Sequence, residues 1–374
     1  MTMTDTQRKL NVAVLFGGRS GEHEVSLMSA RSVLSVMDPK RYTVTQIAIT
    51  KRGRWFTGEG AIGALERGTT EGLEHAILTP DPSEPGIYVL RGSEYTKYAD
   101  IDVFFPMMHG TYSEDGTLQG LLEMADVAYV GAGVVGSAVG MDKGIFKDVM
   151  IANGIPVVET MVVLRSEIEQ DMGAVVQKAQ GLSDFPLFTK PANLGSSVGV
   201  TKCNNLSDLQ EGLREAASFD RRVLIQKGIR NAREIEVSVL GNEEPQASVP
   251  GEVQPSREFY SYESKYIDGT SGLLIPAPLP EDTSAQIREM AIRAYKAIDC
   301  AGMARVDFFV EKDSHKVYLN EVNTIPGFTQ ISMYPKLWEA SGLAYGRLVD
   351  RLIELALERK YQRDQTIHEY RSQA

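Results

Sequence analysis

The feature of this sequence that most constrains its fold is the alternation of short apolar runs with helix-like segments in the first third of the chain. Residues 12–16 form an apolar run before a glycine pair, and further strand-like runs cover 43–49 and 102–110. Helix-like stretches follow the first and third of these runs, the latter at 115–125. Strands that alternate with helices favour a parallel sheet, so the chain is predicted to belong to the α/β class.

Three polar side chains come just after the predicted strands: Glu22, His109 and Glu114. Ligand groups gather beyond the carboxyl ends of parallel strands, which makes this edge a candidate site. Simpler interpretations stay open. Glu22 and Glu24 could simply interact with the dipole at the N-terminus of a helix. His109 could be an ordinary loop histidine whose hydrogen bonds are satisfied.

Composition narrows the class of protein. The chain has 374 residues and a net charge of −11, without a run rich in Lys or Arg, which disfavours a nucleic-acid or anionic-membrane partner. Its two cysteines lack metal-ligand spacing and are typical of reduced thiols. The longest uncharged apolar run, 127–141, is too short to span a bilayer, and the N-terminus lacks the apolar core of a signal peptide. We expect a cytoplasmic enzyme of two or three domains.

The segment 304–327, ARVDFFVEKDSHKVYLNEVNTIPG, predicts a β-hairpin centred on Ser314. In that register Asp307 faces Glu321, Arg305 faces Asn323, and Phe309 faces Leu319 farther along. Two carboxylates and an amide on one face suit Mg²⁺ shared with substrate phosphates, although a solvated face with cross-strand ion pairs is an alternative. The adjoining NTIPGFT favours the metal, because a glycine after proline exposes backbone N–H groups beside it.

The stretch 188–200, FTKPANLGSSVGV, combines a lysine, two serines and glycines but does not have the order of a P-loop. Lys190 ends a predicted strand, and Lys143 opens a helix for which Asp142 is the predicted N-cap. Both lysines suit phosphate oxygens. The alternatives are ordinary surface lysines and a simple hairpin turn.

Local patterns predict further elements after residue 157. Ser166 with Glu169, and Ser207 with Gln210, fit capping boxes at two helix starts. Strands are predicted at 186–191, 197–202, 222–226 and 234–240, and helices at 284–299 and near 343–360. The segment 257–273, rich in Tyr, Ser and Gly, is either a packed Ω-loop or an active-site lid.

Taken together, the motifs resemble those of the D-alanine–D-alanine ligases of the ATP-grasp superfamily. They are VLFGGRSGEHEVSL, HGTYSEDGTLQG, MDK, KPANLGSSVGV, REIEV, FYSYESKY, ARVDFF and LNEVNTIPG, in family order along nearly the whole chain. The resemblance implies an N-terminal parallel-sheet domain at 1–142, a central ATP-grasp part at 143–236, and a C-terminal catalytic part at 237–374 with the lid at 257–273. It also implies a homodimer, with D-alanine and ATP as substrates.

The resemblance also implies residue roles. ATP would be bound by Lys143, Lys190, Ser196, Ser197, Gln226, Lys227, Ile229, Glu234 and Lys265. Two Mg²⁺ ions, with Mn²⁺ as an alternative, would be held by Asp307, Glu321 and Asn323. The substrate would contact Glu22, His109, Arg305, Gly327 and Ser332, and the catalytic set would be Glu22, Ser196, Tyr266, Arg305 and Gly327. Within that set Glu22, Ser196 and Tyr266 would form a link that holds the lid shut.

Two departures and several rivals accompany this prediction. Gln226 stands where Glu is common at the adenine hinge, and Ser113 stands where Gly is common before Glu-Asp-Gly. A D-alanine–D-lactate ligase is the nearest rival, but such relatives have histidine where this chain has Tyr266. A nucleotide-binding regulator without catalysis would not need Arg305, Asp307, Glu321 and Asn323 all present. A dinucleotide oxidoreductase is disfavoured because GGRSG is not G-x-G-x-x-G.

Overall fold

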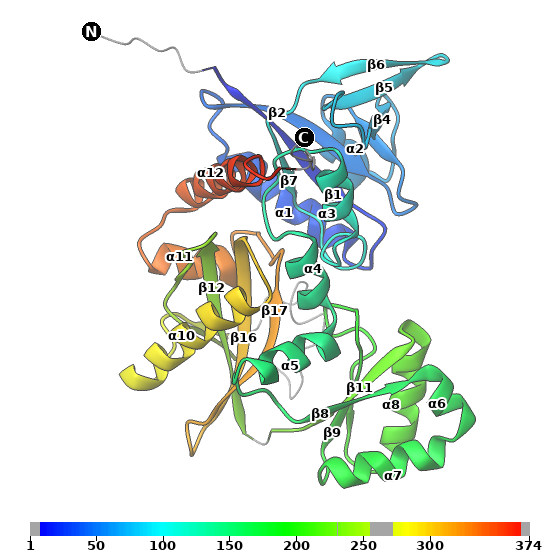
Figure 1. Ribbon diagram of the computed structural model, residues 1–374, viewed down its shortest axis with the longest axis vertical. Helices are drawn as coiled ribbons and strands as arrows, with labels where there is room; N and C mark the ends of the chain where they lie inside the picture. The colour runs from blue at the N-terminus through cyan, green and yellow to red at the C-terminus, as the bar shows by residue number, and fades with distance from the viewer. Residues whose placement is uncertain (1–7, 230, 255–271, 368–374) are drawn as a thin grey trace, which may run out of the picture.

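The computed structural model describes residues 8–229, 231–254 and 272–367, which form three sheets with helices between and around them (Figure 1). The strands are β1 Leu10–Gly17, β2 Tyr42–Ile49, β3 Trp55–Thr57, β4 Glu74–Leu78, β5 Ile87–Arg91, β6 Glu94–Ala99, β7 Val103–Pro106, β8 Thr160–Leu164, β9 Leu187–Pro191, β10 Thr201–Cys203, β11 Arg222–Lys227, β12 Ala232–Gly241, β13 Gln246–Ala247, β14 Gly251–Gln254, β15 Gly272–Leu274, β16 Gly302–Glu311 and β17 Val317–Asn323. The helices are α1 His23–Val36, α2 Ala61–Glu66, α3 Thr117–Met124, α4 Val134–Met141, α5 Lys143–Ala152, α6 Arg165–Gln170, α7 Met172–Leu182, α8 Leu206–Phe219, α10 Glu281–Ala297, α11 Met333–Ala340 and α12 Tyr345–Arg363.

The N-terminal sheet has seven strands in the order β6-β5-β4-β3-β2-β1-β7. Its first predicted strands, β1, β2 and β7, pair in parallel as expected. The strands β3 to β6, which the periodicity did not predict, extend the sheet in antiparallel pairings. The parallel prediction is therefore confirmed for the part of the sheet whose carboxyl ends carry Glu22, His109 and Glu114.

The second sheet has four strands in the order β10-β9-β11-β8. The predicted strand at 197–202 was wrong at its start, because 196–199 form a turn and β10 begins only at Thr201. Since β9 and β10 pair in antiparallel fashion, the segment between them is the loop of a hairpin and does not lead into a helix. The strands β9 and β11 thereby carry one wall of a cavity described below.

Both predicted capping boxes were wrong in position. Helix α6 begins at Arg165, and its entry is capped by Glu167 Oε2, which accepts from the Leu164 N–H at 2.7 Å. Helix α8 begins after Asn205, whose Oδ1 accepts from the Asp208 N–H at 3.0 Å. By contrast, Asp142 caps α5 as predicted and accepts from the N–H groups of Gly144 and Ile145, each at 3.0 Å.

The third sheet runs β15-β14-β12-β16-β17, with β13 beside β12. Its β16–β17 hairpin has the predicted register at the site end, where Asp307 faces Glu321 and Arg305 faces Asn323. The register then shifts, so that Leu319 faces Phe308 and not Phe309 as predicted. The extra residue, Asn320, is accommodated as a β-bulge, and both Asn320 and Glu321 line the same cavity.

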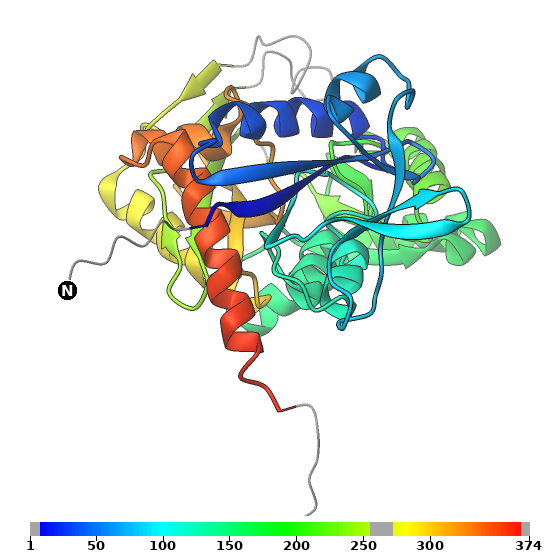
Figure 2. The ribbon, with the colours of Figure 1, turned by 90° about the horizontal axis from the view of Figure 1, so that it is seen from above.

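Helices join the three parts of the molecule. Helix α12 packs on the N-terminal sheet, where Leu348 and Leu352 share a core with Val12 and Val14 of β1 (Figure 2). Helix α5 packs on the third sheet through Phe146 and Met150.

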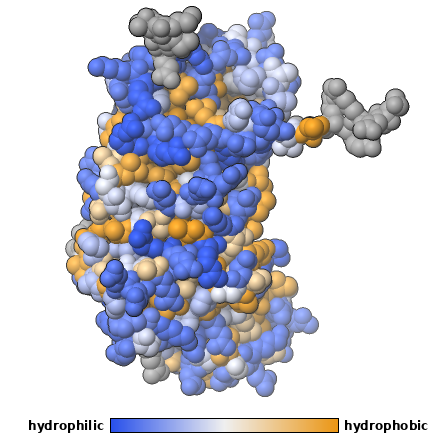
Figure 3. All heavy atoms as spheres, turned by 60° about the vertical axis from the view of Figure 1, so that its left-hand side comes forward, coloured by the Kyte–Doolittle hydropathy of each residue, from blue (hydrophilic) through white to orange (hydrophobic). Residues whose placement is uncertain are grey.

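In the described residues, no helix has both the length and the apolar character that a membrane crossing requires. One face of the molecule is mainly hydrophilic, with hydrophobic patches in between (Figure 3).

Candidate active site

A cavity of about 610 Å³ lies between the second and third sheets. Its walls come from β9, its loop and β11 on one side, and from β12, β16 and β17 on the other. The predicted residues that line it are Lys143, Lys190, Ser196, Ser197, Gln226, Lys227, Ile229, Glu234, Asp307 and Glu321. The fold thus brings together ten predicted residues that are spread over almost 180 positions of sequence.

The loop between β9 and β10 forms a tight turn over this cavity. Ser196 and Ser197 both have left-handed backbone conformations, with φ of 51° and 58°. The Val198 N–H donates to the Gly195 carbonyl at 3.2 Å, which closes the turn around the two serines. Non-glycine residues pay for such conformations, so the surrounding contacts must hold the turn in place.

Lys143 supplies part of that support. Its Nζ donates to the Leu194 carbonyl at 3.0 Å, and its backbone N–H donates to the Ala192 carbonyl at 3.0 Å. The same ammonium lies 3.4 Å from Glu321 Oε2. Lys143 therefore links the glycine-rich loop of the second sheet to the acidic strand of the third.

Lys190 and Gln226 form a second polar pair, on the wall that β9 and β11 build. Lys190 Nζ donates to Gln226 Oε1 at 3.3 Å. Gln226 is only 3% exposed, so its side chain lies in the wall rather than in solvent. A glutamine amide accepts this bond without the negative charge that a glutamate would bring.

The acidic end of the cavity has an all-oxygen donor set. Asp307 faces Glu321 across the hairpin, and Asn323 Nδ2 donates to Asp307 Oδ2 at 3.0 Å. Carboxylate and amide oxygens are the ligands that Mg²⁺ takes when it shares its coordination sphere with phosphates. Among the described residues, no group of three or more His, Cys, Asp and Glu could cage an ion alone, so an ion here would need substrate oxygens as further ligands.

Arg305 lies between two carboxylates. Its Nε and NH2 groups donate to the two oxygens of Asp307 at 2.7 and 2.6 Å, and its Nε lies 3.0 Å from Glu236 Oε2. Glu236 lines the cavity but was not predicted from the sequence. Two acidic neighbours fix the guanidinium plane at the edge of the oxygen donor set.

Glu22 lies where the N-terminal sheet meets the glycine-rich loop. The Ser196 hydroxyl donates to Glu22 Oε1. A Cβ on Gly110 would approach Glu22 Oε2 to 2.6 Å, and one on Gly195 would approach it to 2.9 Å. The carboxylate is therefore packed between two glycines. The third predicted member of this link, Tyr266, lies outside the described residues, as does Lys265 and most of the predicted lid.

His109 is buried and already has a partner at each ring nitrogen. Nδ1 lies 2.9 Å from the Ile325 carbonyl oxygen, and Nε2 lies 2.9 Å from Ser29 Oγ. Burial lowers the pKa of the imidazole, which favours its neutral form. Gly327 and Ser332, the remaining predicted substrate contacts, lie together, since a Cβ on Gly327 would be 3.1 Å from Ser332 Oγ.

Glu114 is a partly buried acid that the sequence placed near the site without a defined role. Its Oε2 accepts from the Gly110 N–H at 2.8 Å and its Oε1 accepts from the Ile325 N–H at 3.1 Å. Burial, followed by the negative charge of Glu22, raises the pKa of the Glu114 carboxyl to about 8. Its position after a parallel strand was the only sequence signal for it.

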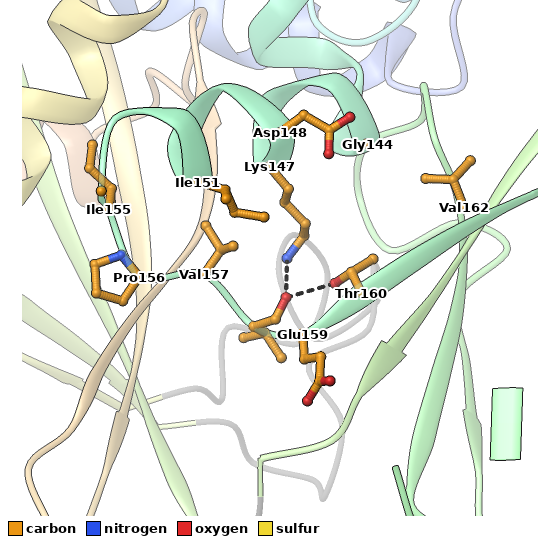
Figure 4. A pocket seen from close by; sticks show the side chains of 12 residues that line it. Gly144, Lys147, Asp148, Ile151, Ile155, Pro156, Val157, Glu159, Thr160 and Val162 are labelled. Atoms are coloured by element: carbon orange, nitrogen blue, oxygen red, sulfur yellow. Dashed lines mark hydrogen bonds between the residues drawn. The ribbon is translucent and has the colours of Figure 1, made fainter. Parts of the chain in front are cut away.

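Lys147 is a functional candidate that sequence reasoning missed. It lies one turn after Lys143 and lines a separate cavity of about 460 Å³ beside α5 (Figure 4). Its Nζ donates to the Val158 carbonyl at 3.4 Å, an oxygen that also accepts from the Thr160 hydroxyl at 2.8 Å. Burial, and then the positive charge of Lys190, lower the pKa of the amine to about 7. Its i,i+4 spacing from Lys143 was the available signal.

Two sheets that enclose lysines, a glycine-rich hairpin loop and paired carboxylates define a ligase of the ATP-grasp class. Comparison with known proteins specifies the family. The family models described as D-ala D-ala ligase N-terminus and D-ala D-ala ligase C-terminus match residues 11–132 and 149–354. The chain belongs to the D-alanine–D-alanine ligase family.

Individual relatives agree along nearly the full chain. A D-alanine–D-alanine ligase of Thermoanaerobacter sp. (strain X514) is 52% identical over 353 residues, which cover 94% of this chain and 97% of that protein. Among solved structures, the D-alanine–D-alanine ligase from Coxiella burnetii has a TM-score of 0.82 at 37% identity, covering 96% of this chain and 97% of its own. The VanG D-Ala:D-Ser ligase from Enterococcus faecalis has a TM-score of 0.83 at 32% identity, covering 93% and 100%.

Proposed function

We propose that this chain joins two D-alanine molecules to D-alanyl-D-alanine at the expense of ATP, for the synthesis of peptidoglycan precursors. The observation that supports this most strongly is that Ser196, Asp307 and Glu321 line one cavity, while Glu22 accepts from Ser196 and Arg305 donates to Asp307. The family uses ATP, a divalent metal ion and D-alanine in general. The roles of the individual residues are our proposal.

In the first step, a carboxylate oxygen of the first D-alanine attacks the γ-phosphorus of ATP, and the bond to the β,γ-bridging oxygen breaks. The products of this step are D-alanyl phosphate and ADP. We assign Glu22 to the substrate ammonium, and Lys143, Lys190 and the serines of the 195–199 turn to the phosphates. Gln226, Lys227, Ile229 and Glu234 would surround the adenosine.

In the second step, the amine of the second D-alanine attacks the acyl carbonyl. The nitrogen loses a proton, and phosphate leaves with the oxygen that joined it to the acyl carbon. Arg305 and the Gly327 N–H would stabilise the oxyanion, and one such donor is typically worth about 3–4 kcal/mol. Ser332 would bind the carboxylate of the second substrate.

Asp307, Glu321 and Asn323 would hold two Mg²⁺ ions, or Mn²⁺, and such ions neutralise the charge that moves between the phosphates. In the structure, Arg305 and Asn323 both donate to Asp307. To bind an ion, Asp307 would therefore have to release Arg305 and Asn323. Arg305 would then still have the carboxylate of Glu236 as a partner.

The remaining parts of the proposal concern assembly and location. We propose three domains at 1–142, 143–236 and 237–374; the second of these boundaries falls within β12, Ala232–Gly241, which belongs to the third sheet. We also propose a homodimer, which light scattering can test. A cytoplasmic location fits the use of ATP and the two free, buried thiols of Cys203 and Cys300.

The second substrate needs a direct test, because a D-Ala:D-Ser ligase shares this fold. Purified protein with ATP and Mg²⁺ would be given D-alanine, L-alanine, D-alanine with D-serine, or D-alanine with D-lactate, and the products would be identified by mass. We expect D-alanyl-D-alanine to dominate in every mixture that contains D-alanine. A dominant mixed dipeptide or depsipeptide would refute the dipeptide assignment, and ATP use without D-alanine would refute the substrate assignment.

A further inference from the structure

Three hydrogen bonds attach the turn Ile325-Pro326-Gly327-Phe328 to helix α1 and the loop after β7. Two of them are made by Ile325, before Gly327, and one by Phe328, after it. The Ile325 N–H donates to Glu114 Oε1 at 3.1 Å, and the Ile325 carbonyl lies 2.9 Å from His109 Nδ1. The Phe328 N–H donates to Ser29 Oγ at 3.3 Å. We call Ser29, His109 and Glu114 the clamp.

The hydrogen atoms of the clamp can be assigned from chemistry. A carbonyl only accepts, so His109 Nδ1 carries the proton that bonds to Ile325. Nε2 of the neutral ring then accepts, and the Ser29 hydroxyl donates to it at 2.9 Å. Ser29 Oγ in turn accepts the hydrogen bond from the Phe328 N–H. Because Glu114 also accepts from the Gly110 N–H at 2.8 Å, each clamp side chain has at least two partners.

The clamp surrounds Gly327 without touching the cavity between the sheets. Ile325 and Phe328 are buried at 2% and 0% exposure, as are His109 at 3% and Ser29 at 0%. Gly327 itself is more exposed than either neighbour. Anchoring two buried residues on either side of an accessible glycine limits how far its N–H can move.

We propose that Ser29, His109 and Glu114 are positioning residues that fix the Gly327 N–H where the tetrahedral oxyanion forms. This inference rests on the proposed function of the same site. It also gives His109 a role other than direct contact with the substrate carboxylate, since both of its ring nitrogens are engaged within the protein. Helix α1 and the loop after β7 thereby set the geometry of a donor on a distant loop.

The test uses the full chain with Ser29→Ala and the near-isosteric Glu114→Gln. The matched control is Ser26→Ala, which lies one turn earlier on α1. Ser26 is also fully buried, donates to the Met107 carbonyl at 2.5 Å, and accepts from the Gly17 N–H at 2.7 Å. The control therefore removes a similar hydroxyl with similar bonds, but none to the turn at 325–328.

Removal of one oxyanion donor lowers kcat by about 10²–10³-fold, so loosening the donor should lower it about 10-fold to 100-fold. We expect that loss in both clamp variants, an unchanged KM for ATP, and more ADP released per dipeptide formed. Ser26→Ala should lose as much thermal stability as Ser29→Ala while its kcat stays within about 2-fold.

The proposal is overturned if folded Ser29→Ala or Glu114→Gln keeps normal kcat, or if Ser26→Ala loses kcat equally. If Ser29→Ala does not fold, Glu114→Gln alone tests the proposal. The outcome is separable from the proposed function. Wild-type protein that makes no dipeptide contradicts the function, whereas active wild type with unaffected clamp variants contradicts only this inference.

Discussion

The contact between Gly195 and Glu22 gives the sharpest prediction for the glycine-rich loop. A Cβ at Gly195 would lie 2.9 Å from Glu22 Oε2 and 3.6 Å from the carboxyl carbon and from Oε1. A Cβ does not approach another atom to less than 3.0 Å, and ordinary contact begins at 3.4 Å, so Gly195→Ala must move the loop and the carboxylate apart by about half an ångström. The next residue, Ser196, donates to that carboxylate and would lose its bond.

A hydrogen bond to a charged group contributes about 1.5–3 kcal/mol, and each 1.4 kcal/mol is a factor of about ten. We therefore expect Gly195→Ala to lower kcat/KM for D-alanine about 10-fold to 100-fold, with nucleotide affinity changed much less. Steady-state ADP release with varied D-alanine measures the first quantity, and nucleotide titration measures the second.

Gly21→Ala is the matched control, because it adds the same methyl group beside Glu22 in sequence but meets nothing within 4 Å. It should keep kcat/KM within about 2-fold of wild type. A folded Gly195→Ala protein with the same kcat/KM as Gly21→Ala would refute the reasoning that the loop and Glu22 act through direct contact.

Three further changes test other parts of the account. Lys190→Ala should reduce ATP turnover by orders of magnitude with little change in melting temperature, and near-normal turnover would remove its proposed phosphate role. Lys147→Met should stabilise the fold by about 1–4 kcal/mol at or below pH 7, measured by urea titration. The pKa of Lys147 is about 7 in the folded state and higher in the unfolded state. Below pH 7 the buried amine is therefore charged, and this charge destabilises the folded state. The gain should shrink as pH rises toward 10, and a gain independent of pH would contradict the lowered pKa. Asp142→Ala should lower the free energy of unfolding by about 1–2 kcal/mol through the lost cap alone, whereas Asp142→Asn should retain most of it; equal loss in both would shift the main role to the ion pair with Arg222.

The sequence predicted those features of the fold that local periodicity determines. The parallel pairing of β1, β2 and β7 followed from apolar runs, and the facing of Asp307 with Glu321 followed from hairpin symmetry about Ser314. The bulge at Asn320 could not be predicted, because hairpin counting assumes one residue opposite one residue. Its effect is to turn two consecutive side chains toward the same cavity.

The capping errors have a common cause. At α6 and α8 the sequence offers several competing polar residues within one turn, and short-range patterns do not rank them. Asn205 caps α8 in place of Ser207, and Glu167 caps the entry of α6 in place of the predicted Ser166 pair. Helix boundaries set by such competition shift by one or two residues without changing the fold.

Site residues that lie within a sequence motif could be predicted. Site residues that tertiary packing alone brings to the site could not. Strand ends, the glycine-rich stretch and the hairpin register indicated Glu22, Lys190, Arg305 and the acidic hairpin, the resemblance added their roles, and the structure brings these segments together. Burial creates the unusual environments of Lys147 and Glu114, and burial of single polar residues is not readable from their neighbours in sequence. Ser29 is an unremarkable helix residue until the fold places Phe328 beside it.

The most direct test of the central claim follows oxygen through the reaction. D-alanine labelled with ¹⁸O in its carboxylate would be incubated with the protein, ATP and Mg²⁺, and the released phosphate would be analysed by mass spectrometry. If the carboxylate attacks the γ-phosphorus and phosphate later leaves from the acyl carbon, each dipeptide formed transfers one ¹⁸O atom to phosphate. Dipeptide formation with unlabelled phosphate would contradict the acyl phosphate route and the roles assigned to this site.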